Sequence, residues 1–141
     1  MLSGRILIDT GPIVALLREK DEHHALCVEE LSKHKPPLYT CWSVVTEAAW
    51  LLRKDPAALT GLFRAFQGGL LAFLPLDEDA IPWLNNFLQK YSDIQAQLAD
   101  ASLVYLAERE SIRTVFTLDH RDFGVYRYGK NKSLKIVPSF K

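Results

Sequence analysis

The sequence predicts an α/β fold of three layers, in which helices flank a central, mainly parallel sheet. Two observations favour this class. Short apolar segments typical of strands alternate with longer segments typical of helices, and proline, glycine or polar residues separate most of them. The length of 141 residues suits one core, and no repeat or low-complexity segment interrupts the chain. We therefore expect residues 1–141 to form a single domain.

The first half of the chain contains two strand candidates and three helix candidates. Arg5 to Asp9 is a short, largely apolar run typical of a strand, and Pro12 follows where a helix begins, since proline suits the first helical turn. The next helix candidate has an acidic start and a basic end, which suit the helix dipole, and Pro36-Pro37 ends it. Ser43 is expected to be an N-cap. These features predict strands at residues 5–9 and 38–42, and helices at residues 11–19, 21–33 and 44–54.

The second half repeats this alternation. Asp55-Pro56 opens a helix that Gly68-Gly69 ends, and Pro82 stands near the start of the next helix. The segments LLAFLPL, TVFTL and KIVPS are apolar enough to be strands. We expect strands at residues 70–76, 114–118 and 135–139, and helices at residues 56–66, 79–91 and 97–110. Strands that alternate with helices indicate parallel pairing.

Composition excludes several classes of protein. Hydrophobic residues make up 48% and charged residues 24%, as in soluble globular proteins. No apolar run approaches the ~20 residues that a membrane helix needs, and the first strand begins too early to leave room for a signal peptide. Cys27 and Cys41 cannot make a disulfide framework. We therefore expect a cytoplasmic protein without membrane contact.

The charges balance to zero overall but not locally. Residues 121–141 carry six basic side chains against Asp122, a net of +5, so residues 1–120 carry −5. Aromatic residues interleave with these cations, a pattern that suits contact with RNA. The alternative is a solvated basic tail, which this feature alone slightly favours. The candidate RNA-binding residues are Arg121, Arg127, Lys130 and Lys132.

The segment ILIDTGP places a carboxylate, Asp9, directly after an apolar strand, and two interpretations compete. Asp-Thr-Gly after apolar residues occurs in aspartic proteases, and an acid at the end of the first strand of an α/β fold is often a metal ligand. Aspartic proteases are all-β proteins with a glycine-rich flap and need two such aspartates, whereas this chain has one Asp-Thr-Gly and a helix-rich pattern. The protease interpretation is therefore disfavoured.

Three further acids stand where apolar residues are expected. Glu47 lies on the helix face of Val44 and Leu51, Asp100 lies on an apolar helix face, and Asp119 ends the TVFTL strand. Each alone could be a cap or an ion-paired residue. Together with Asp9 they would converge where the carboxyl ends of parallel strands meet. Clustered carboxylates repel unless a divalent cation neutralises them, and oxygen ligands favour Mg²⁺ or Mn²⁺. Such a site suits hydrolysis of a phosphodiester bond.

The chain resembles the PIN-domain ribonucleases, most closely the VapC-type toxins of toxin–antitoxin pairs. Four stretches carry the resemblance: ILIDTGPIVALL, WSVVTEAAWLL, LADASLVYLAE and FTLDHRDF. They occur in the order of the family and span residues 6–123. Each motif is weak alone, but the ordered set is fairly specific for a three-layer PIN-like fold and its site.

The resemblance implies a metal-dependent endoribonuclease whose acidic quartet is Asp9, Glu47, Asp100 and Asp119, with Glu47 acting on the metal through water. It also implies that Thr10 and Thr117 orient these carboxylates and that Asp122 is a substitute or extra acid; Gly11 is expected to let the backbone pass close to the site. The family further implies an RNA substrate, a cognate antitoxin and a homodimer. The alternatives are a PIN-fold RNA- or protein-binding module without catalysis, and an RNA-processing nuclease outside any toxin pair.

Overall fold

In the computed structural model, which describes residues 4–139, five strands form one sheet in the order β3-β2-β1-β4-β5. Every neighbouring pair of these strands is parallel, so the predicted α/β class is confirmed. The strands are β1 (Leu7–Ile8), β2 (Leu38–Thr40), β3 (Leu71–Phe73), β4 (Thr114–Phe116) and β5 (Lys135–Val137). All five lie inside the expected segments but are shorter.

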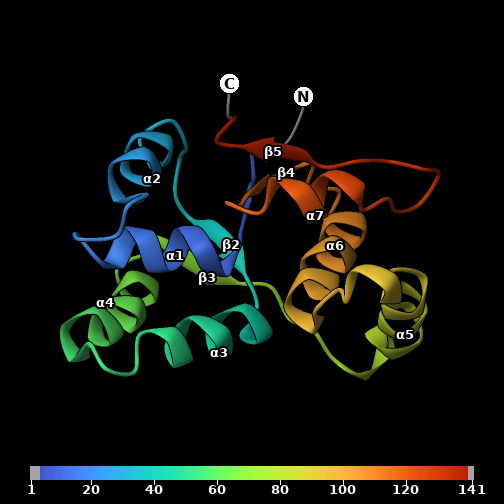
Figure 1. The fold of residues 1–141 in the computed structure, drawn as a ribbon, viewed down its shortest axis with the longest axis horizontal. Helices are drawn as coiled ribbons and strands as arrows, with labels where there is room; N and C mark the ends of the chain where they lie inside the picture. The colour runs from blue at the N-terminus through green and yellow to red at the C-terminus, as the bar shows by residue number, and fades with distance from the viewer. Residues whose placement is uncertain (1–3, 140–141) are drawn as a thin grey trace.

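Helices connect successive strands and cover the sheet. Figure 1 shows α1, α2 and α4 on one side of strands β1 and β2, and α5 and α6 on the other. The α-helices are α1 (Thr10–Leu17), α2 (His24–Leu31), α3 (Trp42–Leu51), α4 (Pro56–Gln67), α5 (Ile81–Lys90), α6 (Leu98–Glu110) and α7 (His120–Val125). Short 3₁₀ turns are η1 (Glu78–Ala80) and η2 (Ser92–Ile94). Among the described residues, no helix is both long and apolar enough to cross a membrane.

Two local expectations are wrong. Ser43 is not an N-cap: Cys41 holds that position with extended backbone angles, and the helix begins at Trp42. The chain turns from strand to helix at the fully buried Cys41, so Ser43 already lies in the first helical turn. The sequence also gave no indication of α7, because its six residues are too few to show a helical repeat of apolar positions.

The order of the strands creates a crevice. Strand β1 is central, with β2 on one side and β4 on the other, so the chain reverses its direction of travel across the sheet between β1 and β4. In open α/β sheets, ligands bind outside the carboxyl ends of the strands at such a switch point. The register pairs Ile8 with Phe116, and the next residues are Asp9 and Thr117. The backbone therefore brings the segment after β1 and the segment after β4 together.

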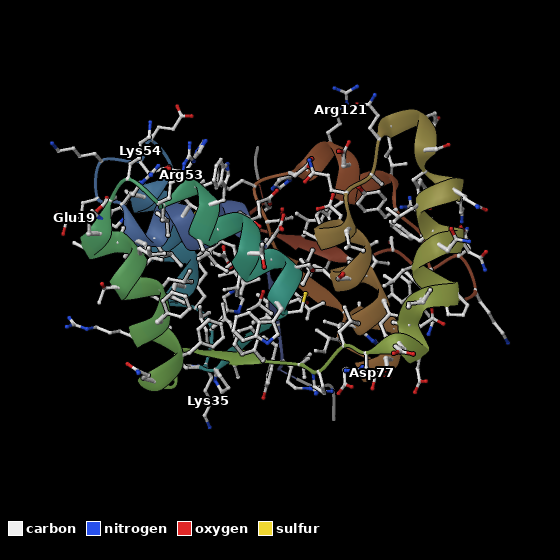
Figure 2. The ribbon with its side chains drawn as sticks, turned by 90° about the horizontal axis from the view of Figure 1, so that it is seen from below. Glu19, Lys35, Arg53, Lys54, Asp77 and Arg121 are labelled. Atoms are coloured by element: carbon white, nitrogen blue, oxygen red, sulfur yellow. The ribbon has the colours of Figure 1, made fainter. Side chains whose placement is uncertain are left out.

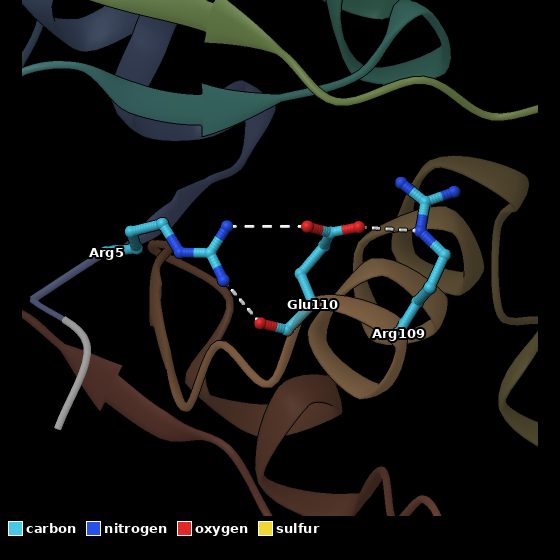
Figure 3. A network of polar contacts seen from close by, with 3 residues as sticks. All are labelled: Arg5, Arg109 and Glu110. Carbon is cyan, nitrogen blue, oxygen red and sulfur yellow. Dashed lines mark hydrogen bonds and ion pairs between the residues drawn. The ribbon is translucent and has the colours of Figure 1, made fainter.

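A polar network ties the start of β1 to the end of α6 (Figure 3). The Arg5 guanidinium donates to the carboxylate of Glu110 at 3.4 Å and also to its backbone carbonyl. The Arg109 Nε donates to the same carboxylate at 2.8 Å, and the hydrogen bond from Arg109, followed by that from Arg5, lowers the pKa of Glu110. Because these groups are partly exposed, the network contributes modestly to stability. Its main effect is to fix α6 beside β1.

Candidate active site

Asp9 lies where strand β1 meets helix α1 and is the most buried of the candidate acids. Its side chain is 7% exposed, and its backbone N–H donates to Phe116 O at 2.9 Å, which continues the pairing of β1 with β4. Burial raises the pKa of Asp9 to about 6, and the nearby charges of Glu47 and Asp119 contribute to the increase. A carboxylate kept in this position without a cation is electrostatically unfavourable.

Thr117 connects two of the acids. Its hydroxyl donates to Asp9 Oδ2 at 2.8 Å and accepts the backbone N–H of Asp119 at 3.0 Å. The residue is fully buried directly after β4, so the hydroxyl has little freedom to rotate away. Thr117 therefore fixes the orientation of the Asp9 carboxylate and the start of the segment that carries Asp119.

Asp119 and Asp122 belong to the start of helix α7. Asp119 is the N-cap residue, and its Oδ1 accepts the backbone N–H of Asp122 at 3.0 Å. Burial and the neighbouring Asp119 charge raise the pKa of Asp122. Carboxylate oxygens of Asp100, Asp119 and Asp122 all lie within 4.8 Å of one another. The sequence ranked Asp122 below the quartet, whereas the structure places it in the tightest group of acids.

Asp100 approaches from the opposite element, the first turn of α6. Its Oδ2 accepts a hydrogen bond of 2.8 Å from the hydroxyl of Tyr126, which is 1% exposed. Burial, followed by repulsion from Asp9, raises the pKa of Asp100 to about 7, although the bond from Tyr126 acts in the opposite direction. The sequence did not indicate Tyr126, because its position beside Asp100 depends on how α7 packs.

The acids share one cavity of about 670 Å³. It is lined by Asp9, Glu47, Asp100, Asp119 and Asp122, together with residues of η2 and the segment that follows it. Glu47 reaches this cavity from α3 and is half-buried. Among the described residues, the tightest acidic group does not include Glu47 or Asp9. The structure thus brings the predicted quartet into one cavity, and the role of each acid stays a prediction.

The donor set fits a hard divalent cation. The groups that face one another are carboxylates, which are the ligands that Mg²⁺ and Mn²⁺ prefer, and thiol or imidazole ligands are not part of the tightest group. The raised pKa values of Asp9 and Asp100 show that mutual repulsion and burial disfavour the charged forms when no cation is present. A bound cation would remove this repulsion.

Comparisons with known proteins identify the family. The family model described as "PIN domain" matches residues 6–130. The chain belongs to the PIN domain family. It is 29% identical over 135 residues to "Ribonuclease VapC26" of Mycobacterium tuberculosis, an alignment that covers 94% of this chain and all of that protein. The crystal structure of Mycobacterium tuberculosis VapC20, described as a toxin that cleaves the sarcin-ricin loop, superimposes with a TM-score of 0.74 at 16% identity, covering 82% of this chain and 91% of that chain. The predicted family resemblance is confirmed.

Two neighbours of Asp9 in this PIN domain differ from expectation. The Thr10 hydroxyl donates to the backbone carbonyl of Val44 at 3.4 Å and not to a carboxylate, so it joins α1 to α3. The predicted close passage of the backbone at Gly11 is wrong, since a Cβ there would meet Leu118 at 3.5 Å, an ordinary contact. Of the two threonines, Thr117 has the contact expected of a residue that orients an acid.

The candidate RNA-binding residues of the PIN domain fall into two groups. Arg121 is exposed at the start of α7, next to Asp122, and Figure 2 shows its side chain pointing away from the protein. Arg127, Lys130 and Lys132 line cavities that contain none of the five acids. The expectation that one basic segment lies beside the acidic pocket therefore holds for Arg121 alone among these four.

Proposed function

We propose that this protein is an endoribonuclease that hydrolyses RNA phosphodiester bonds with Mg²⁺ or Mn²⁺, and that it is the cytoplasmic toxin of a toxin–antitoxin pair. The observation that carries the proposal is the convergence of five carboxylates from separate segments in one cavity at the switch point of the sheet. Membership of the PIN family and the similarity to a protein named a ribonuclease support it. The all-parallel sheet is incompatible with the alternative of an aspartic protease.

In this proposal Asp100, Asp119 and Asp122 hold the cation, with Asp9 beside them. Such a cation, when bound, polarises the scissile phosphate and makes water more acidic. Thr117 and Tyr126 each donate to the Oδ2 of one carboxylate, Asp9 and Asp100 respectively, which leaves the Oδ1 atoms for a ligand. These bonds fix the carboxylates before substrate arrives.

The reaction that fits this arrangement is the addition of water across a phosphorus–oxygen bond. The water oxygen attaches to phosphorus while the bond to the 3′-oxygen breaks, so one product carries a 5′-phosphate and the other a 3′-hydroxyl. One water proton must leave, and the 3′-oxygen must gain a proton. Glu47, which faces the cavity from α3 and is outside the tightest acidic group, is the carboxylate available to accept the water proton.

The first experiment measures cleavage of a mixed pool of cellular RNA with Mg²⁺ or Mn²⁺, with EDTA, and with the Asp9→Asn variant. We expect cleavage that needs the metal and that falls by about 100-fold or more in the variant, because Asn cannot supply a charged ligand. Asp77→Asn is the matched control, since Asp77 lies outside the acidic cavity and is labelled at the edge of the molecule in Figure 2. Full metal-dependent activity in Asp9→Asn would contradict the site assignment.

The same experiment separates the alternatives. A folded protein that binds no divalent cation and cuts no RNA would be a PIN-fold binding module. A nuclease whose expression leaves growth unaffected would be an RNA-processing enzyme outside a toxin pair. Growth arrest that requires Asp9 is the outcome expected for a toxin.

We also propose an antitoxin partner and a homodimer. Large apolar side chains are exposed on α3 and α4, including Trp42 at 63%, Trp50 at 62% and Phe63 at 44%. Trp42 stacks on Phe73 with a centroid distance of 4.3 Å, so the exposed ring is held in place. Exposed apolar groups of this size favour a protein partner. Light scattering of the purified chain, alone and after expression with a neighbouring small gene, tests both partners.

A further inference from the structure

Six basic side chains outside the acidic pocket line two adjoining cavities. The first, of about 460 Å³, includes Trp83, Lys90 and Arg127. The second, of about 1070 Å³, includes Arg113, Lys130, Lys132 and Lys135. Both are lined by Tyr128, Gly129 and Asn131, so the two cavities form one continuous surface, which we call the distal groove.

The distal groove concentrates charge in a chain whose formal net charge is zero. Glu108 is the one carboxylate residue that lines it, against six cations, and the Glu108 carboxylate accepts the indole N–H of Trp83 at 3.1 Å. Among residues 4–139, none of the six cations forms an ion pair with a carboxylate. A local excess of unpaired positive charge attracts phosphates.

The groove is already ordered. Tyr128 and Lys132 exchange two backbone hydrogen bonds of 3.0 and 2.8 Å, and between them Gly129 and Asn131 adopt the left-handed φ values of 53° and 60° that a tight turn requires. The Tyr128 side chain is 9% exposed and anchors the turn in the core. In Figure 1 the segment between α7 and β5 extends toward the side where α5 lies. The lysines of this turn therefore lose little backbone entropy when a ligand binds.

The groove and the acidic cavity lie at opposite ends of the sheet but share a border. Thr114 and Lys135, the first residues of β4 and β5, line the groove, whereas the acids follow the carboxyl ends of β1 and β4. Along the chain, Lys90 precedes Ile94 of the acidic cavity by four residues, and Arg127 follows Asp122 by five. The Tyr91 hydroxyl accepts the backbone N–H of Arg127 at 2.8 Å, which holds these two segments together. A strand leaving the acidic cavity past this contact reaches the groove.

We propose that the distal groove binds the phosphate backbone of a single-stranded RNA segment that continues beyond the one being cut. The inference rests on the proposed nuclease function and adds a second, separate binding site to it. Cations spaced along a groove with an aromatic side chain such as Trp83 are what single-stranded nucleic acid requires. The groove would thereby supply the RNA affinity that the negatively charged catalytic cavity cannot.

The test compares two variants that each lose three lysines. Lys130→Gln/Lys132→Gln/Lys135→Gln removes charge from the groove. Lys20→Gln/Lys35→Gln/Lys54→Gln removes the same charge from exposed lysines outside both cavities, and Figure 2 labels Lys35 and Lys54 at the edge of the molecule. Binding of labelled single-stranded RNA is measured by fluorescence anisotropy in EDTA, which prevents cleavage, over a series of salt concentrations. RNAs of about 20 and about 4 nucleotides are used, because only the longer one can fill both sites.

For the longer RNA we expect the groove variant to bind at least about 10-fold more weakly and its logarithmic salt dependence to fall by about 2, since each lost phosphate contact on a single strand removes about 0.7. The control variant should stay within about twofold of the unaltered protein. Cleavage of the short RNA in Mn²⁺ should be the same in all three proteins, because the acids are unchanged.

Equal binding of the longer RNA by both variants would overturn the groove proposal and leave the nuclease intact. If the groove variant loses binding to poly-glutamate but keeps binding to RNA, the groove serves an acidic protein segment, and the proposal is also overturned. If the unaltered protein neither binds nor cuts any RNA, the proposed function fails and the groove proposal fails with it.

Discussion

At the scale of single residues, the site depends on two hydroxyl groups that carry no charge. Thr117 donates to Asp9, and Tyr126 donates to Asp100, each at 2.8 Å. The acids themselves could be found in the sequence, because a carboxylate inside an apolar stripe conflicts with burial unless it has a function. Tyr126 could not be found in this way, since a buried tyrosine matches the pattern of any core. Its partner lies 26 residues away and is known only from the packing.

Tyr126→Phe should shift the pH dependence of cleavage upward. The hydrogen bond from Tyr126 lowers the pKa of Asp100, so its loss raises that pKa further above its ordinary value. Less of the carboxylate is then ionised near neutral pH, and we expect cleavage to fall by about 10-fold or more at pH 7 and to recover partly at higher pH. A pH–rate profile provides the measurement. Tyr105→Phe on the same helix as Asp100 is the control, and an identical profile in both variants would contradict the role of Tyr126.

Thr117→Val should reduce metal affinity by about 10-fold to 100-fold, because the isosteric side chain cannot donate to Asp9 or accept from the Asp119 backbone. Thr117→Ser keeps the hydroxyl and should retain most of the affinity. Calorimetric titration with Mn²⁺ measures the difference. Equal weakening in the Val and Ser variants would point to packing and not to the hydrogen bonds.

At the scale of secondary-structure elements, the alternation of strands and helices was predictable and the short elements were not. All five strands fall inside the expected segments because apolar runs between turn residues identify buried parallel strands. Helix α7 was missed although Asp119 and Asp122 have the spacing of a helix start, in which a capping side chain accepts the backbone N–H three residues later. That spacing was interpreted only as a pair of acids. In this element the same carboxylate caps the helix and faces the cavity.

Asp119→Asn should separate the two roles of this residue. Asparagine caps a helix as well as aspartate does, so thermal stability should change little, whereas metal binding should weaken because the charge is lost. Asp119→Ala should lose both, with a destabilisation of about 1 kcal/mol from the missing cap. Thermal unfolding and Mn²⁺ titration of the two variants check this. A large loss of stability in the Asn variant would mean that the charge, and not the cap, supports α7.

At the scale of the whole molecule, opposite charges gather at opposite ends of one sheet. Five acids line the catalytic cavity, and six cations line the distal groove. The sequence showed the basic excess after residue 120 but not its direction, because Lys130 and Lys132 follow a turn that carries them to the amino ends of β4 and β5. Net charge alone would have argued against an RNA-binding protein. The expectation of a single domain stays a prediction.

The acidic cavity should make the metal-free protein less stable as pH rises. The pKa of Asp9 is about 6 and that of Asp100 about 7 in the folded state, against 3.8 for an ordinary aspartate, so the folded state keeps protons that the unfolded chain has released. Stability from these groups is therefore greatest at low pH and is lost as pH rises from about 4 to about 7. A pKa difference of one corresponds to about 1.4 kcal/mol, so we expect a fall in Tm of about 10 °C between about pH 5 and pH 8.

Addition of Mn²⁺ should reverse most of that fall above pH 7, where the carboxylates are ionised, and should have little effect near pH 5. Differential scanning calorimetry in EDTA and in Mn²⁺ measures both limits. The double variant Asp9→Asn/Asp100→Asn should show a flatter profile and no response to Mn²⁺. An unaltered profile in the double variant would assign the pH dependence to other groups.

The site is assembled from segments that lie far apart along the chain, at residues 9, 47, 100 and 117–126, and this has a consequence for biosynthesis. During translation, Asp9, Glu47 and Asp100 leave the ribosome before β4 and α7 exist. Strand β1 then still lacks its neighbour on one side, and Asp9 has no Thr117 to orient it. Catalytic competence thus arrives late and all at once. An enzyme that cuts RNA would in this way be harmless to the ribosome and message that are making it until nearly the whole fold has been produced.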